Sequence, residues 1–407
     1  MGNITYAYPP LQLYVELTPA GGTLKPPPGK YSGPIVIKKP ITIDGAGKVE
    51  LDGGGSGTVI SILANDSVIR GLHITHSGTS HDSVDAGILI EADNALVENN
   101  VLDEVLFGVH LRNANNNIVR GNRVSSLERD ISIRGDGVRM WYAHDNLIEN
   151  NILHKVRDIA SNNSSGNRIL GNDINDSRIG MEFVFSPDNE VSNNTITNNI
   201  TGIVVIYSEG MKIYGNRLSR MRRLTGAGIS IKESHGVVVV NNEIAHCAVG
   251  LRANSPLDPL NRMVAEGNLF TYNVLGLYFY GEKGGHIIRR NRFVNNFTDV
   301  LGSGGAMTVK DNVWLENQWD NYRGFDQNND GIGDRPHDVY LFSERLWRDK
   351  PMLKFFRGSP VMNALDFSLR LAPFDRPELQ FSDPKPRLIE CNNDDSLAKV
   401  GGCIINN

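Results

Sequence analysis

The amino-acid sequence predicts an all-β fold, a right-handed parallel β-helix of about 11–13 coils with about 22 residues in each coil. Two periodic features predict it. Pairs of residues that end in asparagine recur along most of the chain, and a series of glycine–apolar pairs runs in parallel with them. Two short strands with alternating apolar residues in every repeat exclude helices and are too regular for separate hairpins.

The asparagine series is the stronger of the two features. Its asparagines are Asn100, Asn122, Asn151, Asn172, Asn194, Asn216, Asn242, Asn268, Asn291 and Asn312. An apolar residue follows each of them by two positions, from Leu102 in the first repeat to Trp314 in the last. Asparagine tolerates the left-handed backbone conformation of a sharp corner, and stacked asparagine side chains hydrogen-bond along a ladder. We therefore expect one asparagine ladder along the β-helix.

The second series places an apolar residue after a glycine once in each repeat. Its apolar members are Ile88, Val109, Val138, Ile159, Met181, Ile203, Ile229, Leu251, Leu277 and Val300. Asp158 and Asp299 stand where the other repeats have glycine. We expect these apolar residues to point inward, and the handedness preference of parallel crossovers predicts right-handed winding.

Four segments follow from this pattern. Residues 1–58 are expected to form an N-terminal cap and the first coils, 59–320 the repeats, 321–340 a calcium-like loop that closes the β-helix, and 341–407 a C-terminal tail. A single coil would not fold, because about five inward side chains at ~1.5–3 kcal/mol each do not offset ~1–2 kcal/mol of backbone entropy for each ordered residue. The ends therefore need caps, and the stretch LQLYVEL at 11–17 is a candidate for a short capping helix.

The segment NYRGFDQNNDGIGD matches the Asp-x-Asn-x-Asp-Gly spacing of calcium loops. Its predicted Ca²⁺ ligands are Asp326, Asn328, Asp330, the backbone carbonyl of Ile332, and Asp334. The twelfth position of the loop is His337 instead of the glutamate of an EF-hand. A single-ion loop that fastens the last coil and a solvated acidic turn without an ion both remain open.

Composition and charge exclude two classes of function. The chain has 41 basic and 46 acidic residues and a formal net charge of -5, which gives no electrostatic basis for nucleic-acid binding. No apolar run reaches the ~20 residues of a transmembrane helix. Because no charged and apolar leader opens the chain, we expect either a cytosolic protein or one whose signal segment is missing from this sequence.

The three cysteines differ in their surroundings. Cys391 and Cys403 flank a polar segment, and either a small disulfide loop or two free thiols fits them. Cys247 stands at an apolar repeat position, which favours a small buried side chain over a reactive thiol.

The repeats together with the tail resemble the NosD family, the periplasmic β-helix proteins of nitrous oxide reductase maturation. The segments that carry the resemblance are GGTLKPPPGKYSGPIVI, GDGVRMWYAHDNLIENN, NQWDNYRGFDQNNDGIGDRPH and LWRDKPMLKFFRGSPVMNALDF. The resemblance implies a non-enzymatic periplasmic protein that works beside an ABC ATPase and its membrane permease. It also implies that the protein helps a copper chaperone to deliver copper to the apo nitrous oxide reductase.

The tail has the spacing of one or two amphipathic helices between 341 and 374. The residues predicted to dock on the permease are Leu341, Leu346, Trp347, Met352, Phe355 and Phe356. A cap on the last coil is the alternative use of the same apolar face, and the two are compatible.

A copper role calls for thioether and imidazole donors, which soft Cu⁺ prefers. The candidates for transient Cu⁺ binding are His110, Met140, His144 and Met181. Met140 also falls at an inward position and so has a core alternative. The family coil that we expect to read Leu-His-Phe-Met reads GMEFVF here, so its histidine and second methionine are missing. Candidates for a harder divalent ion are His73, His76 and His81, for which solvated loop histidines are the alternative.

Polysaccharide lyases and epimerases are the main alternative, because many parallel β-helices act on acidic polysaccharides. Such chemistry needs a base beside an acid on the outer face of neighbouring coils. The motif RPHD at 335–338 is incomplete and follows the repeats, and Asp136, Glu182 and Glu233 have no apparent acidic partner one coil away. A carbohydrate-binding or surface-layer β-helix is the third class. We expect no enzymatic activity.

Overall fold

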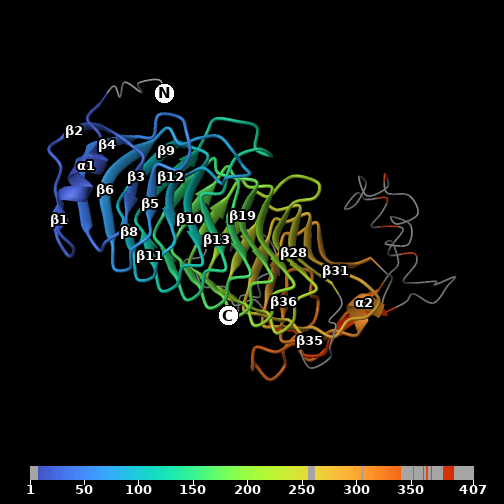
Figure 1. Ribbon diagram of the computed structural model, residues 1–407. Helices are drawn as coiled ribbons and strands as arrows, with labels where there is room; N and C mark the ends of the chain where they lie inside the picture. Colours follow the sequence, from blue (N-terminus) through green and yellow to red (C-terminus); the bar gives the residue numbers. More distant parts are fainter. Residues whose placement is uncertain are drawn as a thin grey trace.

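The computed structural model describes residues 8–254, 262–303, 307–340 and 379–388, with isolated positions at 352, 361, 364 and 368. The described chain winds into an elongated parallel β-solenoid that runs from the N-terminal end to β36 (Figure 1). Each coil contributes one strand to a twelve-stranded sheet, and most coils contribute two strands to a 24-stranded sheet. The predicted fold class, an all-β solenoid of about 12 coils, is confirmed.

The twelve-stranded sheet forms one long side of the solenoid. Its strands are β3 (Ile35–Ile37), β5 (Ile60–Ile62), β7 (Ala86–Ile90), β10 (Phe107–Arg112), β13 (Val138–Trp141), β16 (Ile159–Asn162), β19 (Ile179–Val184), β22 (Thr201–Ile206), β25 (Ala227–Lys232), β28 (Val249–Asn254), β31 (Leu275–Tyr280) and β34 (Thr298–Gly302). All neighbours are parallel, and Val138 lies opposite Ile159, which lies opposite Met181. The second sequence series is therefore one inward row, as predicted.

The 24-stranded sheet covers the other two sides. Its strands are β1 (Thr23–Leu24), β2 (Gly29–Ser32), β4 (Thr42–Asp52), β6 (Val68–Thr75), β8 (Leu96–Glu98), β9 (Val101–Val105), β11 (Ile118–Arg120), β12 (Arg123–Ser126), β14 (Leu147–Glu149), β15 (Ile152–His154), β17 (Arg168–Leu170), β18 (Asp173–Asn175), β20 (Glu190–Ser192), β21 (Thr195–Thr197), β23 (Lys212–Tyr214), β24 (Arg217–Ser219), β26 (Val238–Val240), β27 (Glu243–Ala245), β29 (Val264–Glu266), β30 (Leu269–Thr271), β32 (Ile287–Arg289), β33 (Arg292–Val294), β35 (Val313–Leu315) and β36 (Gln318–Trp319).

An asparagine ladder runs along the bend between these two sides. In a typical step, the backbone N–H and the Nδ2 of Asn194 both donate to Oδ1 of Asn216, at 2.9 Å each. The residues before the ladder asparagines take the left-handed conformation, with φ of 53° at Asn150 and 54° at Asn193. The ladder supplies partners to buried polar groups at every bend, so it stabilises the stack of coils.

One member of the predicted ladder is wrong. The last rung is Asn317, whose Oδ1 accepts from the Nδ2 of Asn291 at 3.1 Å. Asn312 belongs to a different bend, where its Oδ1 accepts from the N–H of His286 at 2.9 Å. The inward residue that follows the last rung is therefore Trp319, opposite Phe293, whereas Trp314 is an inward residue of the preceding strand, opposite Ile288. A short helix, α2 (Met307–Lys310), lengthens this coil and shifts the position at which the ladder resumes.

The N-terminal end is capped by α1 (Leu11–Leu17), as predicted. Leu11 and Val15 are buried against the first coil. Gln12 pairs with the exposed edge of β3, because its Oε1 accepts from the N–H of Val36 at 2.8 Å. The helix thus covers the apolar end and satisfies a strand edge.

The C-terminal end is capped by an antiparallel pair, β37 (His337–Tyr340) and β38 (Leu379–Asp383). Phe381 stacks on Trp314 with ring centroids 4.4 Å apart and covers the apolar core. Asp383 ends the ladder, since its Oδ2 accepts from the N–H and the Nδ2 of Asn317 at 2.9 Å each. Within the described part of the chain, no helix has the length and apolar character needed to cross a membrane.

Candidate functional site

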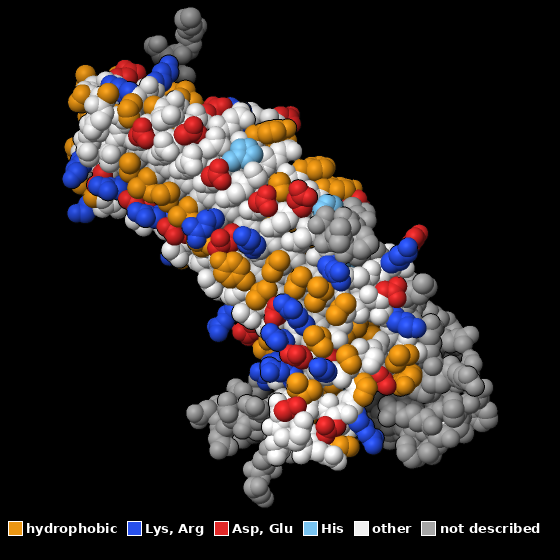
Figure 2. Space-filling view, turned by 90° about the horizontal axis from the view of Figure 1, so that it is seen from below, with side chains coloured by type: hydrophobic (Ala, Val, Ile, Leu, Met, Phe, Trp, Pro, Cys, Tyr) orange, Lys and Arg blue, Asp and Glu red, His pale blue; other side chains and the backbone are white. Residues whose placement is uncertain are grey.

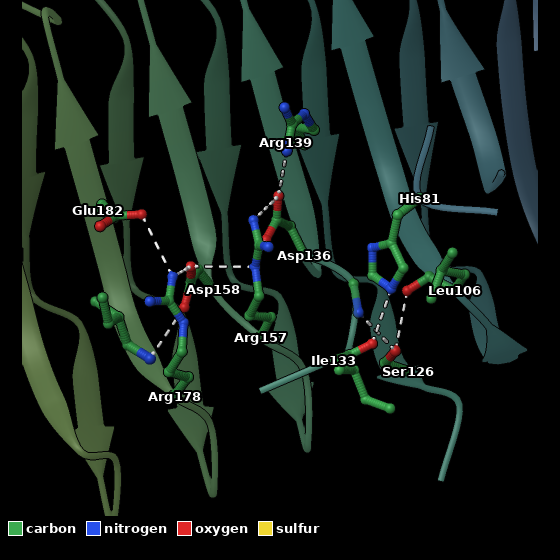
Figure 3. Close-up of polar contacts among 12 residues, drawn as sticks. His81, Leu106, Ser126, Ile133, Asp136, Arg139, Arg157, Asp158, Arg178 and Glu182 are labelled. Carbon is green, nitrogen blue, oxygen red and sulfur yellow. Dashed lines mark hydrogen bonds and ion pairs between the residues drawn. The ribbon is translucent and has the colours of Figure 1, made fainter. Parts of the chain in front are cut away.

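Six charged residues from three successive coils meet at one corner of the solenoid, where the chain enters the twelve-stranded sheet (Figure 3). They alternate in sign along the network. Five of them lie at or just before the beginnings of β13, β16 and β19, and Glu182 lies within β19. In order they are Arg139, Asp136, Arg157, Asp158, Arg178 and Glu182.

The acidic members are held by guanidinium groups from neighbouring coils. Asp136 is fully buried, and its carboxylate accepts from Arg157 Nε at 2.8 Å and from Arg139 Nη1 at 3.1 Å. Asp158 is also fully buried and pairs with Arg178, which reaches Glu182 at 3.5 Å. The backbone N–H of Ile179 donates to Asp158 Oδ1 at 3.0 Å. Asp158 shares Arg157 with Asp136 and Arg178 with Glu182, so the prediction that Asp136 and Glu182 have no acidic partner one coil away is corrected.

Burial shifts the protonation of this network. Burial, together with the charge of Asp136, raises the pKa of Asp158 to about 7, although Arg178 opposes the shift. Burial lowers the pKa of Arg157, but the charges of Asp136 and Asp158 outweigh it and raise that pKa above its ordinary value. Both oxygens of each buried carboxylate face hydrogen-bond donors of the protein. This geometry favours a structural role, in which the carboxylates hold neighbouring coils together, over a catalytic role in which they take a proton from a substrate.

Two loops pack beside the network. His81, from the loop between β6 and β7, makes a 3.0 Å hydrogen bond between its Nε2 and the carbonyl of Ile133, in the loop between β12 and β13. The His81 ring also lies edge-on against Phe107 at 5.6 Å. Ser126 Oγ donates to the carbonyl of Leu106 at 2.9 Å (Figure 3). His81 thus joins two loops.

The other two histidines predicted for a divalent ion lie apart from His81. His73 Nε2 lies 2.8 Å from Asp103 and its Nδ1 lies 3.5 Å from Glu50, while His76 pairs with Asp52 at 3.3 Å. Both ring nitrogens of His73 face carboxylates. No group of three or more His, Cys, Asp or Glu side chains suited to a metal ion occurs among the described residues.

The predicted copper ligands are not brought together. Met140 and Met181 are fully buried in the core, whereas His110 lies on the outer side of the same sheet, opposite Arg139. Met140 lies opposite Leu111, the residue that follows His110. Because successive side chains of a strand point to opposite faces of the sheet, His110 and Met140 lie on opposite faces. Burial, then the charges of Arg139 and Arg112, lower the pKa of His110 to about 3. The ring of the fourth candidate, His144, has its Nδ1 2.9 Å from Ser165 Oγ.

The sequence did not indicate a pair of soft donors that the structure brings together. Cys247 Sγ lies 3.7 Å from Met221 Sδ, and both are buried in the core. Burial raises the pKa of the Cys247 thiol to about 11, so it stays protonated at neutral pH. The contact joins residues 26 positions apart, in neighbouring coils, and the apolar repeat position predicted only that Cys247 is buried.

The calcium-like loop folds around its own backbone amides. Asp326 Oδ2 accepts from the N–H of Gly331 at 2.8 Å, Asp330 Oδ1 from that of Ile332 at 2.8 Å, and Asp334 Oδ2 from that of Gln327 at 2.6 Å. Asn328 Oδ1 accepts from the N–H of Asp330 at 3.2 Å. The predicted oxygen donors therefore lie in one compact loop, and calcium binding there stays a prediction.

The RPHD motif belongs to the C-terminal cap. His337 stacks on Trp319 with centroids 5.0 Å apart, and burial lowers the pKa of His337 to about 4. Of the predicted docking residues, Met352 is described and is 85% exposed. Leu341, Leu346, Trp347, Phe355 and Phe356 lie outside the described residues, as do Cys391 and Cys403.

The outer surface elsewhere is a mixture of charges. Figure 2 shows basic, acidic and apolar side chains interspersed on the face seen from below. Many of the charged residues pair across coils, for example Arg289 with Glu266 at 2.7 Å and Lys30 with Glu50 at 2.9 Å. Such exposed pairs contribute little to stability individually.

Comparison with known proteins identifies the chain's relatives. The family model for the periplasmic copper-binding protein NosD matches residues 125–325, and a model of a protein of unknown function, DUF1565, matches residues 27–161. The "Probable ABC transporter binding protein NosD" of Pseudomonas aeruginosa is 25% identical over 397 residues, covering 88% of this chain and 87% of that protein. The protein of the same name from Stutzerimonas stutzeri is 24% identical and covers 89% and 86%.

Solved structures agree with the fold. A PL6 alginate lyase in complex with a trisaccharide is 15% identical, with a TM-score of 0.53 and coverage of 76% of this chain and 81% of that one. The tailspike protein of E. coli bacteriophage HK620 in complex with a pentasaccharide is 14% identical, with a TM-score of 0.51 and coverage of 76% and 70%. At this identity the likeness concerns the fold alone. The family model over residues 125–325 and the two relatives, which match nearly the whole chain, together support membership of the NosD family.

Proposed function

We propose that this chain is a non-enzymatic periplasmic accessory protein of an ABC transporter system that matures the copper centre of nitrous oxide reductase. The observation that carries the proposal is the match of 88% of the chain to a relative named as an ABC transporter binding protein. The description of the matching family model as periplasmic and copper-binding supports the compartment and the metal.

The site geometry supports a docking role over catalysis. The two buried carboxylates of the charged network, Asp136 and Asp158, already accept from guanidinium and backbone donors. The histidine of the RPHD motif lies in the end cap against Trp319. A lyase or an epimerase needs a base that reaches its substrate, and these groups are engaged with the protein itself.

The proposed partners are the ABC permease and its ATPase at the membrane, a copper chaperone and the apo nitrous oxide reductase. We assign the contact with the permease to the tail between 341 and 374, where Met352 is exposed. The predicted copper ligands do not converge, so we propose that the solenoid holds its partners in place while Cu⁺ passes between them. The calcium-like loop would fasten the end of the solenoid next to the docking tail.

The test is co-purification with the detergent-solubilised permease–ATPase complex of the source organism. The parent chain is compared with a variant in which 345–374 is replaced by a Gly-Ser linker. The variant keeps β37 and β38, because their removal would uncover Trp314 and Asn317 at the end of the core. We expect the parent chain to retain the complex and the variant to lose it.

A thermal unfolding curve equal to that of the parent is the control for the folded solenoid. Failure of the parent chain to bind the complex, together with binding to uronate polymers, would overturn the proposal in favour of a polysaccharide-acting protein.

A further inference from the structure

We propose that one corner of the solenoid binds an anionic lipid surface through two protruding loops. The loops are residues 127–135, between β12 and β13, and residues 220–226, between β24 and β25. Both lie where the chain turns from the 24-stranded sheet into the twelve-stranded sheet, so they project from the same long edge of the solenoid.

The second loop and the strand before it carry an unbalanced positive charge. The stretch RLSRMRRL at 217–224 has four arginines and no acid, in a chain whose formal net charge is -5. Arg220, Arg222 and Arg223 are exposed. None of these three has an ion pair within 4 Å among the described residues, in contrast to Arg217, which pairs with Glu243 at 3.3 Å. The second loop thus presents three exposed cations that have no ion-pair partner within 4 Å in the described part of the chain.

Apolar side chains project from the same two loops. Leu224 is 99% exposed and directly follows the arginines, and Ile133 is 51% exposed in the first loop. A leucine that is wholly in water buries no apolar surface in this chain, so it adds nothing to the stability of the fold. Exposed apolar tips beside cations are typical of segments that enter the interface of an anionic membrane.

The two loops act on one surface because they approach each other along the corner. The pKa of Asp130 is lowered mainly by its hydrogen bonds with Ser132, and the charges of Arg134 and Arg223 add to the shift. Arg134 Nη1 donates to the carbonyl of Asp176 at 3.2 Å and ties the first loop to the coils between them. Arg157 and Arg178 of the charged network lie on these same coils (Figure 3).

This combination favours lipid over the other polyanions. An acidic glycan would pair with the arginines but has no apolar part that requires Leu224, whereas a lipid surface offers phosphate groups and acyl chains to the two kinds of side chain. The two loops are separate in sequence from the tail at 341–374 that is assigned to the permease, so the inference does not depend on the proposed transporter contact. It places the solenoid with this long edge toward the membrane.

The test is flotation of the full chain with vesicles of phosphatidylglycerol and phosphatidylethanolamine, and with vesicles of phosphatidylcholine, at low and at high salt. We expect binding to the anionic vesicles at low salt only, because salt screens these charges. The double variant Arg222→Gln/Arg223→Gln should bind at least about tenfold less, since each arginine near an anionic surface contributes about fivefold. Leu224→Ser should also weaken binding.

Matched controls separate local from overall effects. Lys25→Gln/Lys38→Gln removes the same two charges from exposed positions near the N-terminal end, and Leu17→Ser removes another exposed leucine. These controls should float like the parent chain. Equal binding of the Arg222/Arg223 variant and the parent, or no binding of the parent to anionic vesicles at low salt, would overturn the proposal. Binding of the parent to an immobilised acidic protein but not to vesicles would assign the corner to a protein partner instead.

Discussion

At the scale of single residues, the outer corner depends on Asp158, which stands where neighbouring coils have Gly137 and Gly180. Its carboxylate receives Arg178 and the N–H of Ile179. The Asp158 side chain therefore fixes two neighbouring coils to each other at a position where the adjacent coils have only glycine. Its raised pKa is the cost of burying two carboxylates on adjacent coils.

Asp158 should make stability depend on pH. Its folded pKa of about 7 lies above its unfolded value of 3.8, so the folded state binds the proton more strongly between these values. Stability from this group is present below pH ~4 and is lost as the pH rises through 7, with a slope of at most about 1.4 kcal/mol per pH unit. Asp158→Asn should flatten this slope in urea unfolding curves between pH 4 and 8. Glu128→Gln, at an exposed acid, should leave it unchanged, and an unchanged slope in Asp158→Asn would contradict the prediction.

The ladder asparagines should be costly to remove. The Nδ2 of Asn194 donates to the carbonyls of Ile169 and Ser192, and its Oδ1 accepts from the N–H of Asn172. Asn194→Ala leaves buried donors and acceptors without partners, at about 1–3 kcal/mol for each group. We expect a loss of at least about 2 kcal/mol in the free energy of unfolding, measured with denaturant. Thr195→Ala, on the exposed neighbouring position, should cost much less; equal losses in the two variants would contradict a specific role for the ladder.

At the scale of elements, the strands are too short to be stable alone, and the ends of the stack decide where it stops. Helix α1 covers one end, and strand β38 covers the other with Phe381 over the core and Asp383 on the last asparagine. Strand β38 comes from beyond the calcium-like loop, so this loop lies between the last coil and its cap. Ordering the loop should therefore stabilise the C-terminal end.

Calcium should stabilise the protein if the loop binds it. At a concentration 100 times the dissociation constant, a ligand of the folded state alone adds about 2.7 kcal/mol. We expect Ca²⁺ to raise the unfolding temperature and EGTA to reverse the change. Asp326→Asn/Asp330→Asn should abolish the response. Asp66→Asn, at an exposed corner, should retain it. If the parent chain unfolds at the same temperature with Ca²⁺ and with EGTA, the prediction of calcium binding is wrong and the segment is an acidic turn without an ion.

At the scale of the whole molecule, the strands of each coil pair only with strands of the adjacent coils, so the solenoid is close to one-dimensional. The register confirms this, because Thr195 lies opposite Arg217 and Ile196 lies opposite Leu218. A rigid body of this length presents a corner, two sheets and two capped ends to different partners. This arrangement suits a protein that holds several others, as proposed above.

Removal of one whole coil should preserve the fold. Deletion of residues 195–216 joins Asn194 to Arg217 and keeps every inward and ladder position in register. We expect a β-rich circular dichroism spectrum and cooperative unfolding, with a denaturant slope reduced by roughly one twelfth because less surface is exposed on unfolding. Deletion of residues 195–205 removes half a coil and should prevent folding. Similar behaviour of the two deletions would contradict the model of independent coils.

The sequence by itself determined the period, the inward apolar rows, most of the asparagine ladder and the N-terminal helix. These features repeat or are local, so each repeat carries its own information. The tertiary structure decided which outward side chains meet. Asp136, Asp158 and Arg178 are about one coil apart in the chain, and long arginines join them only once the register at the corner is set. It also decided that Asn317 ends the ladder, because the helical insertion α2 lengthens the last coil, and that Asp383 caps it from a strand far along the chain.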